Sequence, residues 1–258
     1  MNQIFTLPDR ISRPAYASVR TESSAPDDFL AMLAHELRSP LHSILGWVQL
    51  MQRDSSDDLK RNALKAMERN VRAMSQIVDD ILDRSRIVTG KLRLTVEPVD
   101  LGALVREAVS VIRPLADARG IEVHARAPAE LPVIQGDPGR LSQVINNLLS
   151  NAVKFTPRGG RVSVDLEADA HSVRIVVSDT GRGIHPRLLP YLFQRFHQAD
   201  EDIPGTGLGL GLALVKEFVE RHRGQVFAES DGVGCGARFT VLLPFDSRAA
   251  SAETAGEP

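Results

Sequence analysis

The stretch PGRLSQVINNLLSNAVKFTPRGGRVSVDLEADAHSVRIVVSD (residues 138–179) changes its hydrophobic period part-way along. Apolar residues recur at helical spacing from about 138 to 155, and then alternate with polar residues at about 161–167 and 172–178. A helix followed by two half-buried strands is typical of a sheet that carries helices on one face. This stretch therefore predicts an α+β domain.

Segments on both sides continue the mixture of helix and strand. Upstream, the sequence predicts an alternating strand pattern in KLRLTV after Thr89-Gly90, a helix at about 101–118, and strands at about 121–126 and 133–135. Downstream, it predicts a last helix at about 206–222 and a hairpin of strands at about 225–230 and 237–243. Together these segments indicate an α/β sandwich over residues 91–246.

The N-terminal part of the chain follows a helical plan instead. A first helix, capped by aspartates, is predicted from about 27 to 52, and a second follows the polar break RDSSDD and runs from about 59 to 88. We expect residues 27–90 to form a helical hairpin. Residues 1–26 are expected to be a flexible leader and residues 247–258 a disordered tail.

The second helix carries two apolar rows at heptad spacing. They match the a and d positions of a coiled coil: Leu64, Val71 and Val78 in one row, Met67, Met74 and Ile81 in the other. Two antiparallel helices with one apolar stripe each leave surface uncovered, and pairing two chains into a four-helix bundle would cover it. We infer a homodimer. In the alternative, the hairpin packs against its own C-terminal domain.

Composition excludes several classes of protein. The 258 residues carry a net charge of −2 and one cysteine, so the chain has neither the strong field that draws proteins to nucleic acid nor the material for an internal disulfide. The sequence lacks an apolar run near the ~20 residues that cross a bilayer, and its first residues lack the apolar core of a signal peptide. We expect a soluble, cytoplasmic protein without a membrane span.

One histidine on the first helix lies away from the apolar face. At ~100° per residue, His35 falls opposite the apolar arc of the segment FLAMLAHELRSPLHSILGWVQLM and should be exposed. Glu36 can accept the imidazole proton when the ring attacks phosphorus. Ser39, one turn later, can position a water, and Pro40 should bend the helix. A zinc site is not predicted, because HELRS lacks the second histidine of HExxH.

Three further stretches suggest a nucleotide site. On the helix at 138–155, Asn147, Asn151 and Lys154 form a polar strip in which amide oxygens can bind Mg²⁺ and the ammonium can neutralise phosphate. Asp179 ends a strand and can accept the adenine amino group. The run GTGLGLGL leads into a helix whose amides favour phosphate, but dinucleotide, P-loop and serine/threonine kinase signatures are absent from the sequence.

Five motifs taken together resemble the histidine kinases of two-component systems. In order along the chain, HELRSPL is similar to the H box, NNLLSNAVKFT to the N box, DTGRGI to the first glycine box, LFQRFHQAD to the F box and GTGLGLGL to the second glycine box. The resemblance covers roughly residues 28–245. It implies a dimerisation and phosphotransfer hairpin followed by a Bergerat-type ATP-binding domain.

The resemblance also implies roles for individual residues. His35 would be the phosphoacceptor, Glu36 its acid/base partner and Ser39 a residue for dephosphorylating the partner. The expected ATP contacts are Asn147, Asn151 (also the Mg²⁺ ligand), Lys154, Phe155, Asp179, Gly181, Gly183, Gly205, Gly207 and Gly209. Phe155 stands where tyrosine is frequent, and Gln198 where some members have arginine.

The implied function is ATP-dependent autophosphorylation of His35, followed by transfer to an aspartate of a response-regulator receiver domain. Two alternatives remain at this point: an ATPase of the same fold without kinase activity, and a dimeric scaffold whose ATP site has decayed. Sequence does not decide whether the catalytic domain reaches the histidine of its own chain or of the other chain.

Overall fold

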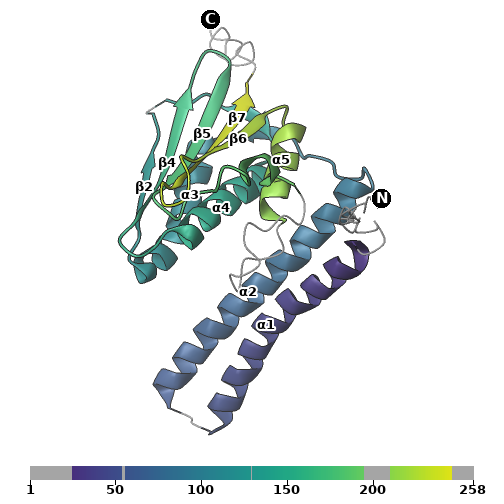
Figure 1. Cartoon of the computed structure of the whole chain (residues 1–258), viewed down its shortest axis with the longest axis vertical. Helices are drawn as coiled ribbons and strands as arrows, with labels where there is room; N and C mark the ends of the chain where they lie inside the picture. Colours follow the sequence, from purple (N-terminus) through teal and green to yellow (C-terminus); the bar gives the residue numbers. More distant parts are fainter. Residues whose placement is uncertain (1–24, 54–55, 129, 195–209, 246–258) are drawn as a thin grey trace, which may run out of the picture.

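A computed structural model describes residues 25–53, 56–128, 130–194 and 210–245. Its N-terminal part is an antiparallel hairpin of two long helices, α1 (Ala25–Arg53) and α2 (Asp57–Val88), drawn at the bottom of Figure 1. Asn70 of α2 donates to the Ser43 hydroxyl of α1 at 3.1 Å, which joins the two helices midway. None of the described helices has both the length and the apolar character needed to cross a membrane.

The C-terminal part is built on a five-stranded sheet in the order β2-β4-β5-β7-β6. Its strands are β2 (Glu122–Arg126), β4 (Arg161–Ala168), β5 (Ser172–Asp179), β6 (Gln225–Glu229) and β7 (Ala237–Pro244). Only the β2–β4 pair is parallel among these strands. A separate antiparallel pair is formed by β1 (Glu97–Val99) and β3 (Ile134–Gly136).

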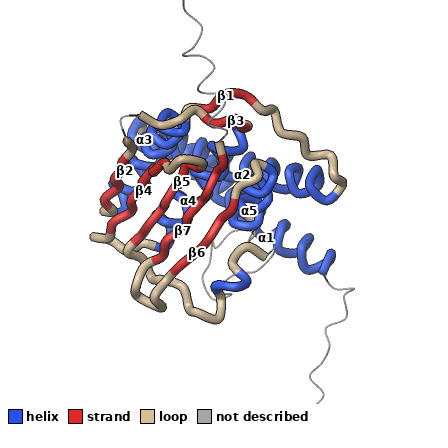
Figure 2. Tube along the Cα trace, turned by 90° about the horizontal axis from the view of Figure 1, so that it is seen from above, coloured by secondary structure: helices blue, strands red, loops and turns tan. Residues whose placement is uncertain are grey.

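Three helices cover one face of the five-stranded sheet, as Figure 2 shows: α3 (Leu101–Arg119), α4 (Pro138–Phe155) and α5 (Gly211–Arg221). The central helix, α4, contacts both α3 and α5. Asp100 and Asp137 cap α3 and α4 by accepting the N–H groups of Ala103 and Arg140. A short 3₁₀ helix, Leu189–Tyr191, follows β5. The predicted α+β class is confirmed.

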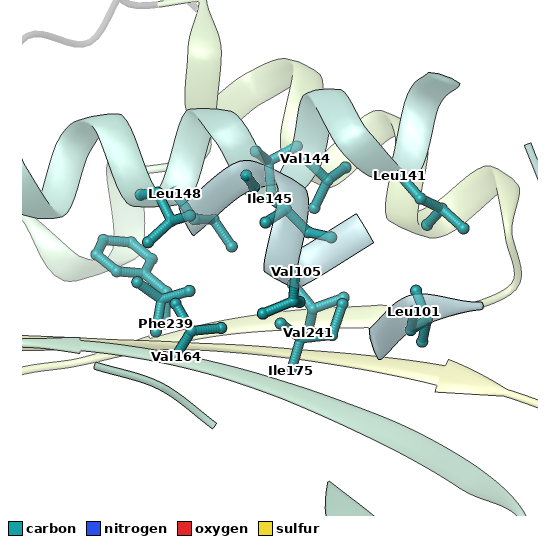
Figure 3. Close-up of a cluster of buried hydrophobic side chains, with 14 of the residues drawn as sticks. Leu101, Val105, Leu141, Val144, Ile145, Leu148, Val164, Ile175, Phe239 and Val241 are labelled. Atoms are coloured by element: carbon teal, nitrogen blue, oxygen red, sulfur yellow. The ribbon is translucent and has the colours of Figure 1, made fainter. Parts of the chain in front are cut away.

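The core lies between α4 and the sheet (Figure 3). Leu148, Ile145 and Leu141 of α4 are completely buried, as are Val164 of β4 and Ile175 of β5. The apolar face predicted for this helix is therefore the buried one. The other face of the sheet is open. A hollow of about 1150 Å³ on that face is lined mainly by strand residues, and none of the candidate site residues lines it.

Two details of the sequence analysis need correction. Lys91, Leu92 and Thr95 do not lie in a strand: the Arg86 carbonyl at the end of α2 accepts the first two N–H groups, and Asp137 accepts the third. The alternation of KLRLTV arises because Leu92 is buried and Leu94 is half-buried, while the other residues of this crossing segment are exposed. The last helix begins at Gly211 within the described residues, and positions 206–209 lie outside them.

The two heptad rows of α2 differ in what covers them. Leu64, Val71 and Val78 of α2 are exposed, as the dimer hypothesis requires. Ile81, however, packs with Ile77 against the core of the C-terminal domain. The alternative in which the hairpin packs on its own domain is thus correct for one end of α2, because its apolar surface is wider than a single row.

Candidate nucleotide and phosphoacceptor site

His35 lies on the exposed surface of α1, as its position on the helical face predicted. Glu36 beside it is half-buried, while Ser39 one turn later is exposed. The helix runs through Pro40 without interruption. An exposed imidazole with a neighbouring carboxylate can act as a nucleophile whose proton has an acceptor.

The polar strip of α4 lies beside the first turn of α5. Asn147 Nδ2 lies 3.4 Å from the carbonyl oxygen of Gly211, at the start of α5. Asn151, one turn further along, is half-buried. At the end of the helix, the Lys154 ammonium lies 5.2 Å from the centre of the Phe155 ring. The strip thus combines amide oxygens with a partly desolvated cation, the groups that a magnesium-bound triphosphate needs.

Asp179 ends β5 and forms a tight turn with the glycines that follow. Its Oδ1 accepts the N–H of Gly181 at 2.8 Å, and burial raises the pKa of its carboxyl group despite that bond and one to Ala237. A Cβ on Gly181 would lie 2.5 Å from the carbonyl oxygen of Phe155, so only glycine fits this close approach. A carboxylate has about four lone-pair positions on its two oxygens, so Asp179 can accept a further hydrogen bond from a base.

Gly183 closes the turn in a left-handed conformation. Its φ is +68°, and a Cβ there would meet the carbonyl group of Gly232 in the β6–β7 connection. Ser230 supports the same loop: its hydroxyl accepts the N–H of Ile184 at 2.9 Å and donates to the Gly236 carbonyl at 2.6 Å. The three predicted residues Gly205, Gly207 and Gly209 lie outside the described residues.

Glu36 of the hairpin interacts electrostatically with Lys154 of the nucleotide strip. Burial lowers the pKa of the Lys154 ammonium, and the negative charge of Glu36 opposes that shift. Leu33, one turn before Glu36, packs against the core of the C-terminal domain. The charge of Glu36, the neighbour of the proposed phosphoacceptor, therefore acts on the cationic end of the α4 strip in the same chain.

The structure adds residues that sequence reasoning missed. The Arg182 guanidinium stacks over the Phe155 ring at 4.3 Å, on the aromatic side chain expected to face the base. Arg140 and Gln143 extend the α4 strip toward α2. Arg140 and Gln143 precede Asn147 by seven and four residues, and this helical spacing was the available signal. Ser230 had no comparable signal in the sequence.

Other histidines in the described residues have different surroundings. Both ring nitrogens of His222 are occupied: Nδ1 donates to the Phe218 carbonyl at 2.7 Å, and Nε2 accepts the Asp137 N–H at 2.9 Å. His124 contacts Glu122, and His185 accepts the N–H of Arg187. Within the ranges that the structure covers, no three His, Cys, Asp or Glu side chains form a metal-binding group.

Comparisons with known proteins divide the chain into the same two parts. Residues 26–90 match the His Kinase A (phospho-acceptor) domain. Residues 136–247 match the histidine kinase-, DNA gyrase B- and HSP90-like ATPase family. The two matches separate the helix that carries His35 from the domain that carries Asn151 and Asp179.

Individual relatives carry both parts. The chain is 34% identical over 270 residues to hybrid signal transduction histidine kinase D of Dictyostelium discoideum, covering 86% of this chain but only 18% of that protein. Among solved structures it resembles full-length ShkA in complex with AMPPNP, with 32% identity, a TM-score of 0.62, and coverage of 85% of this chain and 46% of ShkA.

A second solved structure is matched almost from end to end. The mycobacterial sensor histidine kinase MprB is 31% identical with a TM-score of 0.51, over 58% of this chain and 98% of that one. Motif order, fold and these likenesses agree. The chain belongs to the sensor histidine kinases and carries their phosphoacceptor and ATPase modules.

Proposed function

We propose that the protein is an ATP-dependent protein-histidine kinase that phosphorylates its own His35 and passes the phosphoryl group to an aspartate of a response-regulator receiver domain. One observation carries the proposal: His35 is exposed on α1, and the negative charge of its neighbour Glu36 acts on the Lys154 ammonium of the nucleotide strip. An ATPase of the same fold without kinase activity has no use for a histidine in that place.

In the proposed step, a ring nitrogen of His35 attacks the γ-phosphorus of ATP. An N–P bond forms, the bond from phosphorus to the β,γ-bridging oxygen breaks, and ADP leaves. Glu36 accepts the imidazole proton. Lys154 stabilises the charge that develops on the phosphoryl oxygens, where a partly desolvated cation is more effective than in water.

The remaining candidate residues would hold the nucleotide. We assign Asp179 to the adenine amino group, Phe155 to the face of the base, and Gly181 and Gly183 to the turn that shapes the pocket. Asn147 and Asn151 would lie along the phosphates, and Asn151 would bind Mg²⁺, which draws charge from the phosphate oxygens. Gly205, Gly207 and Gly209 would complete the phosphate side.

The same proposal covers assembly and location. Residues 27–90 would pair two chains as a four-helix bundle, which the exposed row of Leu64, Val71 and Val78 supports. Residues 91–246 would act as the catalytic domain. Ser39, exposed one turn from His35, is placed to orient a water for dephosphorylating the partner. Use of ATP and a receiver domain supports a cytoplasmic location.

Incubation with γ-labelled ATP and Mg²⁺ tests the function directly. The wild-type chain should acquire label that is stable to alkali and lost in acid, as phosphohistidine is. His35→Gln should remove the label while nucleotide affinity and assembly are kept, because exposed polar exchanges usually change stability by within about 0.5 kcal/mol. Glu36→Ala should slow labelling by about 10²- to 10⁴-fold, the usual contribution of a positioned general base.

His42→Gln is the matched control, because His42 is exposed on the same helix and is not assigned a role. Its labelling should equal that of the wild type. Label that persists at the wild-type rate in His35→Gln would contradict the proposal. Phosphate release without labelling of the chain would instead favour the ATPase alternative, and failure to bind nucleotide would favour the scaffold.

A further inference from the structure

A buried ion pair joins α2 of the hairpin to α4 of the catalytic domain. Nη1 of Arg140 donates to Oδ2 of Asp83 at 2.5 Å. The Asp83 side chain is only 4% exposed and that of Arg140 21%. Exposed ion pairs contribute little, but removing one partner of a buried pair leaves an uncompensated charge. The contact therefore depends strongly on both side chains.

The Arg140 side chain is held in place from the catalytic domain. Its Nη1 also donates to Oε1 of Gln143 at 2.9 Å, and its guanidinium lies 5.0 Å from the centre of the Phe218 ring of α5. A guanidinium fixed in this way presents its donors in a set direction. Asp83 thus meets a preorganised partner, so the pair defines an orientation as well as an attraction.

Further polar contacts surround the pair. The Gln143 amide nitrogen lies 3.3 Å from both Asp80 Oδ1 and Asp83 Oδ2, and Arg86 Nη1 lies 3.8 Å from Asp83 Oδ1. Burial raises the pKa of the Asp80 carboxyl group; hydrogen bonds from Gln76 and Gln143 oppose this shift, and the charge of Asp83 adds to it. A network of this kind tolerates few relative orientations of α2 and α4, because each contact constrains the next.

This network lies on the same strip of α4 as the candidate nucleotide residues. Arg140, Gln143, Asn147, Asn151 and Lys154 follow one another at helical spacing. A hollow of about 320 Å³ between α2 and α4 has Asp83, Arg140 and Asn147 among its lining residues. One rigid helix, about 20 Å long between Arg140 and Lys154 at 1.5 Å per residue, therefore connects the ion pair to Lys154, on which the charge of Glu36 acts.

We propose that Asp83 and Arg140 form an interdomain latch that presents the nucleotide site to His35 of the same chain, and that both are positioning residues for phosphoryl transfer. The inference rests on the proposed kinase function. It goes further by naming what aligns the two domains and which histidine is reached. The ion pair of Asp83 with Arg140 lies within one chain, and the charge of Glu36 acts on Lys154 of that same chain.

The test compares Arg140→Gln and Asp83→Asn with the wild-type full chain. We expect the labelling rate of His35 at saturating ATP to fall by about 10- to 100-fold, because small misplacements of reacting groups have effects of that size. The affinity for an ATP analogue should stay within about twofold, since neither residue is among the proposed nucleotide contacts. Arg140→Lys, which keeps the charge, should recover part of the rate.

Glu68→Gln is the matched control: it also replaces a carboxylate on α2, but Glu68 pairs with Arg72 of its own helix. It should label at the wild-type rate. Unchanged or faster labelling in Arg140→Gln and Asp83→Asn would overturn the latch, and so would a parallel loss of nucleotide affinity. A wild-type chain that never labels His35 would instead overturn the kinase proposal, so the two failures are distinguishable.

Mixed dimers test the same-chain part separately. A chain with His35→Gln keeps its nucleotide site, and a chain with Asn151→Ala keeps its phosphoacceptor. We expect no label when the two are unfolded together, refolded and incubated with ATP, because each intact site would face a missing histidine. Label on the Asn151→Ala chain would show transfer between chains and overturn this part of the proposal.

Discussion

The catalytic domain and the helical hairpin differ in how completely they bury their apolar residues. In the catalytic domain, Leu148 of α4 and Phe218 of α5 are 0% exposed. In the hairpin, Leu64 is 62% and Val71 53% exposed. Burying one such side chain contributes about 1.5–3 kcal/mol. The first region therefore supplies its own driving force for folding, whereas the second keeps part of that free energy available for association.

Within the hairpin, too, some apolar residues of α2 are exposed while others are covered. Its exposed row lies along the length of α2, while Ile77, Ile81 and Ile87 pack against the catalytic domain. In the proposed dimer, one helix would thus serve two contacts, with a second chain on one side and with its own domain on the other. A helix used in this way can transmit a change in the dimer to the orientation of the catalytic domain.

The largest expected effect is on assembly. Leu64→Glu combined with Val71→Glu places four carboxylates in the proposed dimer seam, two from each chain. Losing the burial of four side chains at about 1.5 kcal/mol each should weaken the dimer by roughly 6 kcal/mol, enough to give monomers at micromolar concentration. Sedimentation equilibrium measures this directly.

Val111→Glu is the control for that experiment, because Val111 is 68% exposed on α3 and is not assigned to the seam. This variant should sediment as the wild type does. The melting of the catalytic domain should be unchanged in both variants. A double variant that remains dimeric would show that the exposed row is not the seam.

The next largest effect is expected on the stability of the catalytic domain, which buries its apolar residues. Leu148→Ala should lower the free energy of unfolding of the catalytic domain by about 2–5 kcal/mol, because a fully buried leucine leaves a cavity. Urea unfolding followed by circular dichroism gives the value. Leu64→Ala, the same exchange at an exposed position, should leave this transition within about 0.5 kcal/mol. If both variants lost the same free energy of unfolding, burial would not distinguish the catalytic domain from the hairpin.

Periodicity accounts for what the sequence predicted well. The apolar face of α4 and the alternation in β4 and β5 are properties of single elements that bury one face, so their patterns are local. The exposure of His35 could be predicted for the same reason. The packing of the two heptad rows was only partly predictable, because a heptad pattern shows which residues are apolar but not which surface covers each of them.

Contacts between distant elements were beyond local patterns. Nothing in the spacing of Asp80 and Asp83 indicates that Arg140 and Gln143 lie opposite them, since more than fifty residues separate the two sets. The stacking of Arg182 on Phe155 likewise depends on how β5 ends beside α4. KLRLTV shows the reverse error: one buried leucine in a crossing segment imitates a strand.

The smallest effect concerns the partly buried carboxylate of Asp179 in the catalytic domain. Burial raises the pKa of the Asp179 carboxyl group above its ordinary value of 3.8, so the folded state binds this proton more tightly than the unfolded state does. In the window between the unfolded and folded pKa values, the folded state carries more protons, and stability therefore falls as pH rises. Above the window the full cost of the buried charge is present.

Asp179→Asn should therefore make the catalytic domain slightly more stable at pH 7, by up to about 0.5 kcal/mol, the range of most substitutions at partly exposed positions. Its amide oxygen can still accept the Gly181 N–H, so the turn is kept. The difference from wild type, followed by thermal melting, should shrink as pH is lowered through the window. Nucleotide binding should weaken, because the amide nitrogen would then turn donors toward the adenine amino group. A variant that is less stable at pH 7, or a gap that widens on acidification, would mean that the ionised carboxylate stabilises the domain.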